Sequence, residues 1–289
     1  LSQMTQLSTV IQSSFAAIER VFEILDEEEE IPDVENPVKI ENVKGNVTFE
    51  HVNFGYGENS TLIEDLNAEV KSGQMVAIVG PTGAGKTTLI NLLMRFYDVK
   101  KGAIKIDGVD IRDMKRKDLR SMFGMVLQDT WLFNGTIFEN IEYGRFGATK
   151  EEIIQAAKVA NVHHFITTLP DGYNMFLNEE ASNISLGEKQ LLTIARAFIS
   201  DPSILILDEA TSSVDTRLEL MLQKAMRNLM NGRTSFVIAH RLSTIRNADL
   251  ILVMNNGSII EQGNHDELME KGGFYEKLYN SQFADKESE

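Results

Sequence analysis

The chain has 289 residues, of which 43% are hydrophobic and 25% charged, as in an ordinary globular protein with room for one large domain or a core with an inserted subdomain. Its net charge of -15, from 28 basic and 43 acidic residues, argues against nucleic acid as the main partner. The absence of cysteine excludes disulfides, thiolate metal sites and a cysteine nucleophile. With no apolar run of about 18 residues and no signal-peptide pattern, the chain as given is expected neither to cross a membrane nor to carry a secretion signal.

Residues 1–25 are predicted to form one amphipathic helix, because apolar residues recur at three- and four-residue spacing. An acidic run and two prolines then indicate a linker over 26–39. From Val43 the period of apolar residues changes to two, with an irregularity between Phe49 and Val52. This pattern predicts strands that end at 55–57, and a further strand is predicted near 62–70.

The rest of the chain is predicted to alternate between strands and helices. A short apolar strand precedes a glycine-rich loop, and a mostly helical stretch separates two β-rich parts. A Gly257-Ser258 turn predicts a final hairpin, and the charged tail from Asp285 is expected to fray. The predicted strands are 75–79, 204–207, 235–238 and 250–254, and the predicted helices are 87–97, 151–160, 186–198 and 216–230.

The glycine-rich loop is Gly80-Pro81-Thr82-Gly83-Ala84-Gly85-Lys86-Thr87, which matches the P-loop pattern between a strand and a helix. Its glycines allow successive backbone N–H groups to turn inward around a β-phosphate at the helix N-terminus. Lys86 is expected to reach the β- and γ-phosphates, and the Thr87 hydroxyl to bind Mg²⁺. We interpret this loop, together with Thr88, as an ATP-binding site; the alternative is a glycine-rich turn with an unrelated lysine.

Two other predicted strands end in residues suited to phosphate chemistry. Asp208 and Glu209 follow the strand at 204–207, and the carboxyl ends of parallel strands are where α/β sheets bind ligands. Asp208 is expected to hold the Mg²⁺ shell, often through water, and Glu209 to polarise the attacking water as general base. His240 follows the strand at 235–238, and we interpret it as a γ-phosphate sensor rather than a structural histidine.

Together these residues resemble the nucleotide-binding domain of ATP-binding cassette (ABC) transporters of the exporter type, from about Ala16 to Tyr279. The resemblance implies an α/β fold: a P-loop NTPase core of mainly parallel sheet, with an antiparallel β-subdomain and an inserted helical subdomain at about 129–200. It also implies that Tyr56 stacks on adenine and that Asp215 lies in a nucleotide-contacting loop. Gln128 matches a glutamine that contacts Mg²⁺ and the transport domain. The implied catalytic residues are Glu209, His240, Lys86 and Gln128.

The segment 16–26 is similar to the exporter junction between the last membrane helix and the ATPase. It predicts that residues 1–39 are the end of that helix and a linker, 40–285 the ATPase domain, and 286–289 a frayed tail. The resemblance thus implies a longer membrane protein, with this domain on the cytoplasmic face of the cell membrane. The alternative is an amphipathic N-terminal helix that belongs to the domain itself.

The family's signature, Leu-Ser-Gly-Gly-Gln, is altered here to Ile184-Ser185-Leu186-Gly187-Glu188. Ser185 and Gly187 remain as expected nucleotide contacts. Leu186 places a branched side chain where the backbone should approach the γ-phosphate, and Glu188 places a carboxylate near a polyanion. The loop just upstream keeps Glu179 but lacks the family's glycines and basic residue.

In this family each ATP lies between one chain's P-loop and the other chain's signature in a head-to-tail dimer. The resemblance therefore implies two poor sites in a homodimer, but one competent site in a heterodimer. We expect one subunit of a heterodimeric exporter that uses ATP and Mg²⁺, partnered by a second ABC subunit and by a membrane domain of its own full-length chain. The alternatives are an ATP-binding regulatory subunit with little hydrolysis, and a soluble ABC ATPase acting on ribosomes or DNA ends.

Overall fold

A computed structural model describes residues 2–27, 29–57, 60–127, 130–178, 181–208, 216–239 and 242–282. The chain divides into two compact units, Leu1–Asp33 and Val34–Glu289. The first contains helix α1 (Ser2–Leu25), in agreement with the predicted periodicity. Its apolar side chains are exposed, among them Phe15 and Ile24. None of the helices in the described ranges is both long and apolar enough to cross a membrane.

The second unit begins at Val34, several residues before the boundary that the sequence indicates. The backbone N–H of Val38 donates a hydrogen bond to the carbonyl oxygen of Asp113 at 2.8 Å. Ile40 and Val43 pack against the core. The end of the expected linker therefore belongs to the second unit, because Val38 is hydrogen-bonded to that unit.

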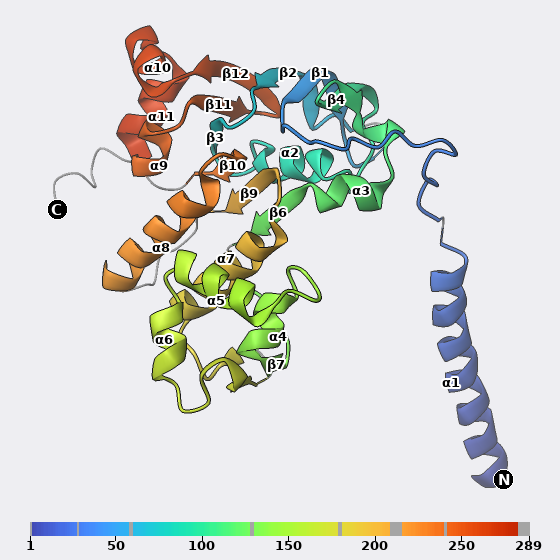
Figure 1. Cartoon of the computed structure of the whole chain (residues 1–289). Coiled ribbons are helices and arrows are strands. Elements are labelled where there is room, and N and C mark those ends of the chain that lie inside the picture. Colours follow the sequence, from blue (N-terminus) through green and yellow to red (C-terminus); the bar gives the residue numbers. More distant parts are fainter. Residues whose placement is uncertain are drawn as a thin grey trace. The chain divides into compact units, whose positions relative to one another are not determined.

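Strands and helices follow one another in the second unit much as predicted (Figure 1). Its strands are β1 (Val47–Phe54), β2 (Ile63–Val70), β3 (Met75–Val79), β4 (Lys101–Ile106), β5 (Val109–Asp110), β6 (Phe123–Val126), β7 (Gly135–Thr136), β8 (Phe176–Leu177), β9 (Ile204–Asp208), β10 (Thr234–Ile238), β11 (Leu250–Asn255) and β12 (Ser258–Gly263). Its α-helices are α2 (Lys86–Leu93), α3 (Arg116–Ser121), α4 (Ile137–Glu142), α5 (Lys150–Val159), α6 (His163–Thr168), α7 (Leu186–Ser200), α8 (Thr216–Met230), α9 (Leu242–Arg246), α10 (His265–Lys271) and α11 (Phe274–Gln282), with 3₁₀ turns η1 (Ile111–Asp113) and η2 (Gly172–Asn174).

The central sheet has the strand order β12-β11-β3-β10-β9-β6. Its neighbouring strands are parallel except for the β11–β12 hairpin, which the Gly257-Ser258 turn predicts. A second, antiparallel sheet has the order β2-β1-β4-β5, and β1 carries a register irregularity between Phe49 and Val52, as its sequence pattern predicts. This is the expected core with an antiparallel β-subdomain, and helices α4 to α7 form the helical subdomain within 129–200.

The central sheet separates two hydrophobic cores, because successive side chains of a strand point to opposite faces. In β3, Val76 and Ile78 join the core shared with the antiparallel sheet and α2, whereas Ala77 and Val79 join the core shared with α5, α7 and α8. Both faces are thus covered, which explains why the parallel strands are continuous apolar runs in the sequence.

Helix α2 ends at Leu93, whereas the apolar spacing predicts a helix as far as residue 97. Arg95 stops the helix, since its φ of 51° lies in the left-handed region. Its buried guanidinium donates hydrogen bonds to the carbonyl oxygens of Ile111 and Met114 at 3.2 and 3.0 Å. These tertiary bonds, which no local pattern reveals, make the early helix end favourable.

Candidate nucleotide-binding site

The P-loop connects buried strand β3 to the start of α2. At Gly80 the backbone φ is 153°, and a Cβ there would lie 2.2 Å from the carbonyl oxygen of Met254. Gly85 is the N-cap of α2 with φ of 101°, and no side chain caps the helix. The first N–H groups of α2 therefore lack the usual capping partner and can bind an anion. The loop fits a phosphate chain because glycine alone permits this close, inward-turned backbone.

Lys86 lies over the P-loop itself. Its Nζ donates hydrogen bonds to the carbonyl oxygens of Gly80 and Pro81 at 2.7 and 3.0 Å. Burial lowers the pKa of Lys86, and the negative charge of Asp208 acts in the opposite direction. The ammonium group is thus held within electrostatic reach of Asp208, ready to exchange two neutral carbonyl partners for charged phosphate oxygens.

Asp208 is brought to the P-loop by the sheet register. It is the last residue of β9 and pairs with Ile238 of β10, which in turn pairs with Ile78 of β3. The strands are parallel, so their carboxyl ends meet at one edge of the sheet, and this edge is where open α/β sheets bind ligands. The structure therefore brings together Lys86 and Asp208.

The residues near this edge suit a cation that is held mainly by phosphate oxygens. Thr87 is exposed on the first turn of α2, and Asp208 is half-buried at the strand end. Among the described residues there is no cluster of three or more acidic or histidine side chains that could hold a metal alone. One hydroxyl and one carboxylate fit Mg²⁺, which typically takes one or two protein ligands and completes its shell with water and substrate phosphates.

Tyr56 lies close to α2. Its side chain is 57% exposed, and its hydroxyl lies 3.2 Å from the Thr88 hydroxyl. Phe54 and Tyr97 contact the Tyr56 ring edge-on, each with ring centroids 5.1 Å from it. Tyr97 was missed by the sequence reasoning, since an aromatic after a helix carries no signal that separates it from other surface aromatics.

Ser185 is the N-cap of α7, within the helical subdomain rather than at the P-loop (Figure 1). It forms a capping box with Glu188: the Ser185 N–H and Oγ–H both donate to Glu188 Oε2, at 2.8 and 2.7 Å. The Glu188 N–H completes the box with a bond to Ser185 Oγ at 3.4 Å. Gly187 is buried in the first turn, and Leu186 is 45% exposed. The altered signature thus has a local role as a helix cap.

Four of the predicted site residues lie outside the described residues, and their roles stay predictions. The strands that precede three of them are β6, β9 and β10, which are parallel and adjacent in the order β10-β9-β6. The four residues are Gln128, Glu209, Asp215 and His240.

The helical subdomain carries an exposed aromatic cluster that the sequence motifs do not identify. It consists of Trp131, Phe133, Tyr143 and Phe146. Trp131 and Phe146 are 63% and 78% exposed. Arg196 holds the cluster together: its guanidinium lies over the Tyr143 ring at 5.1 Å and donates to the Trp131 carbonyl oxygen at 3.0 Å. The density of aromatic residues between 131 and 146 was the available signal.

The fold and the glycine-rich loop at 80–87 define a P-loop nucleotide-binding domain. A family model described as ABC transporter matches residues 63–212, and the chain belongs to that family. It has the ABC ATPase fold and is an ATP-binding domain of the kind that hydrolyses ATP to drive transport.

Several known proteins are similar over almost the whole chain. A "Fatty acid ABC transporter ATP-binding/permease protein" of Mycobacterium bovis is 57% identical over 96% of this chain and 44% of its own length. A "Putative multidrug export ATP-binding/permease protein" of Bacillus subtilis is 49% identical over 95% of this chain and 48% of its own. The solved "Structure of a bacterial Atm1-family ABC exporter with ATP bound" has a TM-score of 0.84 and 42% identity, and the match covers 94% of this chain and 48% of that one. The chain spans about half the length of these relatives.

Proposed function

We propose that this domain is the ATP-driven motor of an exporter, and that ATP-dependent closure of a dimer drives substrate through a membrane domain. The observation that carries the proposal is the P-loop, with Lys86 bonded to its carbonyl oxygens and Asp208 at the same sheet edge. The similarity to ATP-binding/permease proteins supports the link to export.

In this proposal the nucleotide lies along the N-terminal end of α2. Tyr56 stacks on the adenine, residues 80–88 bind the phosphates, and Lys86 neutralises the β- and γ-phosphate charge. Thr87, Asp208 and Gln128 would hold Mg²⁺, which supplies charge neutralisation at the transferring phosphoryl group. Glu209 accepts a proton from the attacking water, and His240 contacts the γ-phosphate.

Glu209→Gln tests the hydrolytic role directly. An amide of the same shape cannot accept the proton, so turnover should fall at least about a hundredfold. ATP affinity, measured by equilibrium binding of a fluorescent ATP analogue, should stay within about twofold, because the P-loop is unaltered. Unchanged turnover would remove Glu209 from the base role, and loss of binding would mean that the residue acts in nucleotide affinity instead.

The signature of this chain is proposed to serve a second, degenerate site in a heterodimer. The single proton of the Ser185 hydroxyl is donated to Glu188, so that hydroxyl is not free to donate to a γ-phosphate while the box is closed. The Glu188 carboxylate also adds negative charge next to the expected position of the phosphates. A partner chain with an intact signature would complete the P-loop site of this chain, which retains all its expected catalytic residues.

The aromatic cluster is proposed to contact the membrane domain of the full-length chain. Exposed aromatic side chains fixed by a half-buried arginine are typical of interface anchors, since they bury large areas at low entropic cost. The cluster lies in the segment that follows Gln128, which the resemblance links to the transport domain. Since residues 16–26 resemble the junction to a membrane helix, we propose that the domain lies on the cytoplasmic face of the cell membrane.

A further inference from the structure

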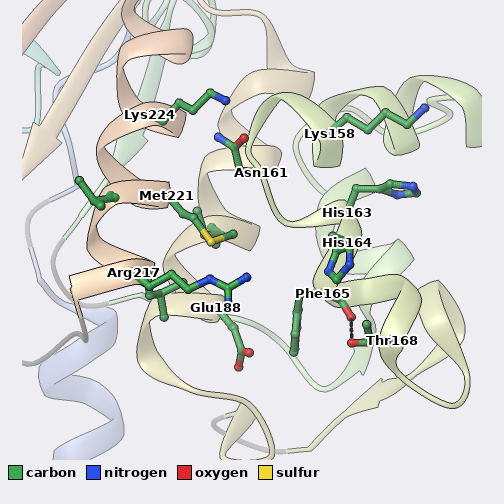
Figure 2. Close-up of a pocket in the computed structure, with 13 residues that line it drawn as sticks. Lys158, Asn161, His163, His164, Phe165, Thr168, Glu188, Arg217, Met221 and Lys224 are labelled. Carbon is green, nitrogen blue, oxygen red and sulfur yellow. Dashed lines mark hydrogen bonds between the residues drawn. The ribbon is translucent and has the colours of Figure 1, made fainter.

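A groove lies in the second unit between α8 on one side and α5 and α6 on the other, beside the first turns of α7. Its volume is about 930 Å³. Figure 2 shows α8 along one side, with Arg217, Met221 and Lys224, and the end of α5 together with α6 along the other, with Lys158 and Phe165. Small-molecule sites typically measure roughly 300–1,000 Å³, so the groove has the size of a ligand site.

The groove is cationic in a strongly acidic chain. Lys158, Arg217 and Lys224 line it, and the only carboxylate among its lining residues in the described part of the chain is Glu188. Glu188 is already occupied by the N–H and hydroxyl of Ser185. Neither lysine has a salt-bridge partner among the described residues. In a protein of net charge -15, this local positive field favours an anion.

The floor of the groove is apolar, which separates it from a site for a bare inorganic ion. Phe165 and Met221 contribute apolar surface between the positively charged side chains. Methionine adapts its shape to flexible apolar groups at low cost. Cations at the rim and an apolar floor together fit an anion that carries an apolar chain.

The two walls of the groove are held in place by hydrogen bonds to neighbouring residues. The Asn228 side chain of α8 donates to the Val159 carbonyl oxygen at the end of α5, at 3.1 Å. The His163 ring of α6 is hydrogen-bonded to the Tyr173 hydroxyl at 2.8 Å. The walls are thus fixed before any ligand binds, and a preformed site loses less entropy on binding.

We propose that this groove binds an organic carboxylate with an apolar chain, with the positive charges of Lys158, Arg217 and Lys224 attracting the carboxylate and Phe165 and Met221 contacting the chain. The site adjoins the first turns of α7, because Glu188 and Leu191 line it. It stands on its own lining residues and does not depend on the proposed export function.

Sodium octanoate is a suitable probe for the purified chain, with octanol and inorganic phosphate as comparisons. Binding can be followed through the ¹³C-methyl resonance of Met221, assigned with Met221→Leu, and by calorimetry. Octanoate should shift the Met221 resonance and bind at least about tenfold more tightly than either comparison ligand, because only octanoate offers both charge and chain.

The paired substitution Lys158→Gln with Lys224→Gln should weaken octanoate binding about threefold to tenfold, since each lysine is exposed and screened by solvent. The matched control is Lys150→Gln with Arg227→Gln, which removes the same charge from the same two helices at exposed positions outside the groove. The control variant should bind octanoate as tightly as the unaltered chain does. Equal weakening in both pairs, equal binding of octanol, or a Met221 resonance that octanoate leaves unmoved would overturn the proposal.

Discussion

At the scale of single residues, the P-loop depends on glycines that differ in how much space surrounds them. A Cβ at Gly80 would collide with the backbone of Met254, whereas a Cβ at Gly83 would meet nothing within 4 Å. Both residues have positive φ, so both substitutions strain the backbone, but only the first also forces strands β3 and β11 apart.

Gly80→Ala should therefore abolish measurable ATP binding and lower the melting temperature, because backbone atoms cannot yield to the new methyl group. Gly83→Ala should cost only about 1 kcal/mol of backbone strain and keep ATP binding in the same range. Thermal melts and ATP titrations of the two variants make the comparison. If Gly80→Ala and Gly83→Ala lose equal amounts of stability and ATP affinity, then backbone conformation alone, and not the contact with Met254, sets the requirement for glycine.

At the scale of elements, α7 begins with a hydrogen-bonded cap that also involves the signature serine. Ser185→Ala should destabilise the domain by about 1 kcal/mol through loss of the cap. Glu188→Gln should leave stability nearly unchanged, since glutamine can also close a capping box. In a dimer, Glu188→Gln should raise turnover at the site that this signature serves. A glutamine variant as unstable as the alanine variant would contradict this role of Glu188.

A histidine of α10 is hydrogen-bonded to α11 and makes a pH-dependent contribution to the free energy of unfolding. His265 Nδ1 lies 2.7 Å from the Tyr275 hydroxyl. Burial lowers the pKa of His265 below its ordinary value of 6.5, Arg246 lowers it further, and Asp266 opposes the change. As pH falls through about 6.5, the unfolded chain gains a proton that the folded histidine resists, so stability falls until the lower folded pKa is reached.

His265→Asn keeps a polar side chain but does not titrate, so its melting temperature should fall less than that of the unaltered chain between about pH 7.5 and about pH 5.5. His164→Asn, at an exposed position, is the matched control and should follow the unaltered chain. If the His265 variant loses as much stability on acidification as the control, the pH dependence arises elsewhere.

At the scale of elements, some features of the fold could be predicted from the sequence and others could not. The buried parallel strands and the P-loop were predictable because continuous apolar runs and a fixed glycine spacing are local signals. The end of α2 was not, since Arg95 is positioned by carbonyl groups far along the chain. Strand β4 was missed because Gly102 and lysines interrupt its pattern. The Ser185–Glu188 box has a sequence signature, Ser-x-x-Glu, which the comparison with the family motif obscured.

At the scale of the whole molecule, the P-loop region and the signature region of this domain differ in how well we expect each to bind a nucleotide. The P-loop, Lys86 and Asp208 lie together at the edge of the central sheet, where we propose a nucleotide half-site. The signature on α7 is occupied with its own helix cap. This contrast is the structural basis for proposing a heterodimer, in which a second ABC subunit would supply the signature for this P-loop.

The most direct test compares the ATPase rate of the purified chain alone with its rate when mixed with a candidate partner, the ABC subunit of the neighbouring reading frame. Our account predicts slow turnover alone, at least about tenfold stimulation by the partner, and loss of that stimulation when this chain carries Glu209→Gln. Cooperative hydrolysis by the chain alone, at a rate that the partner does not raise, would contradict it.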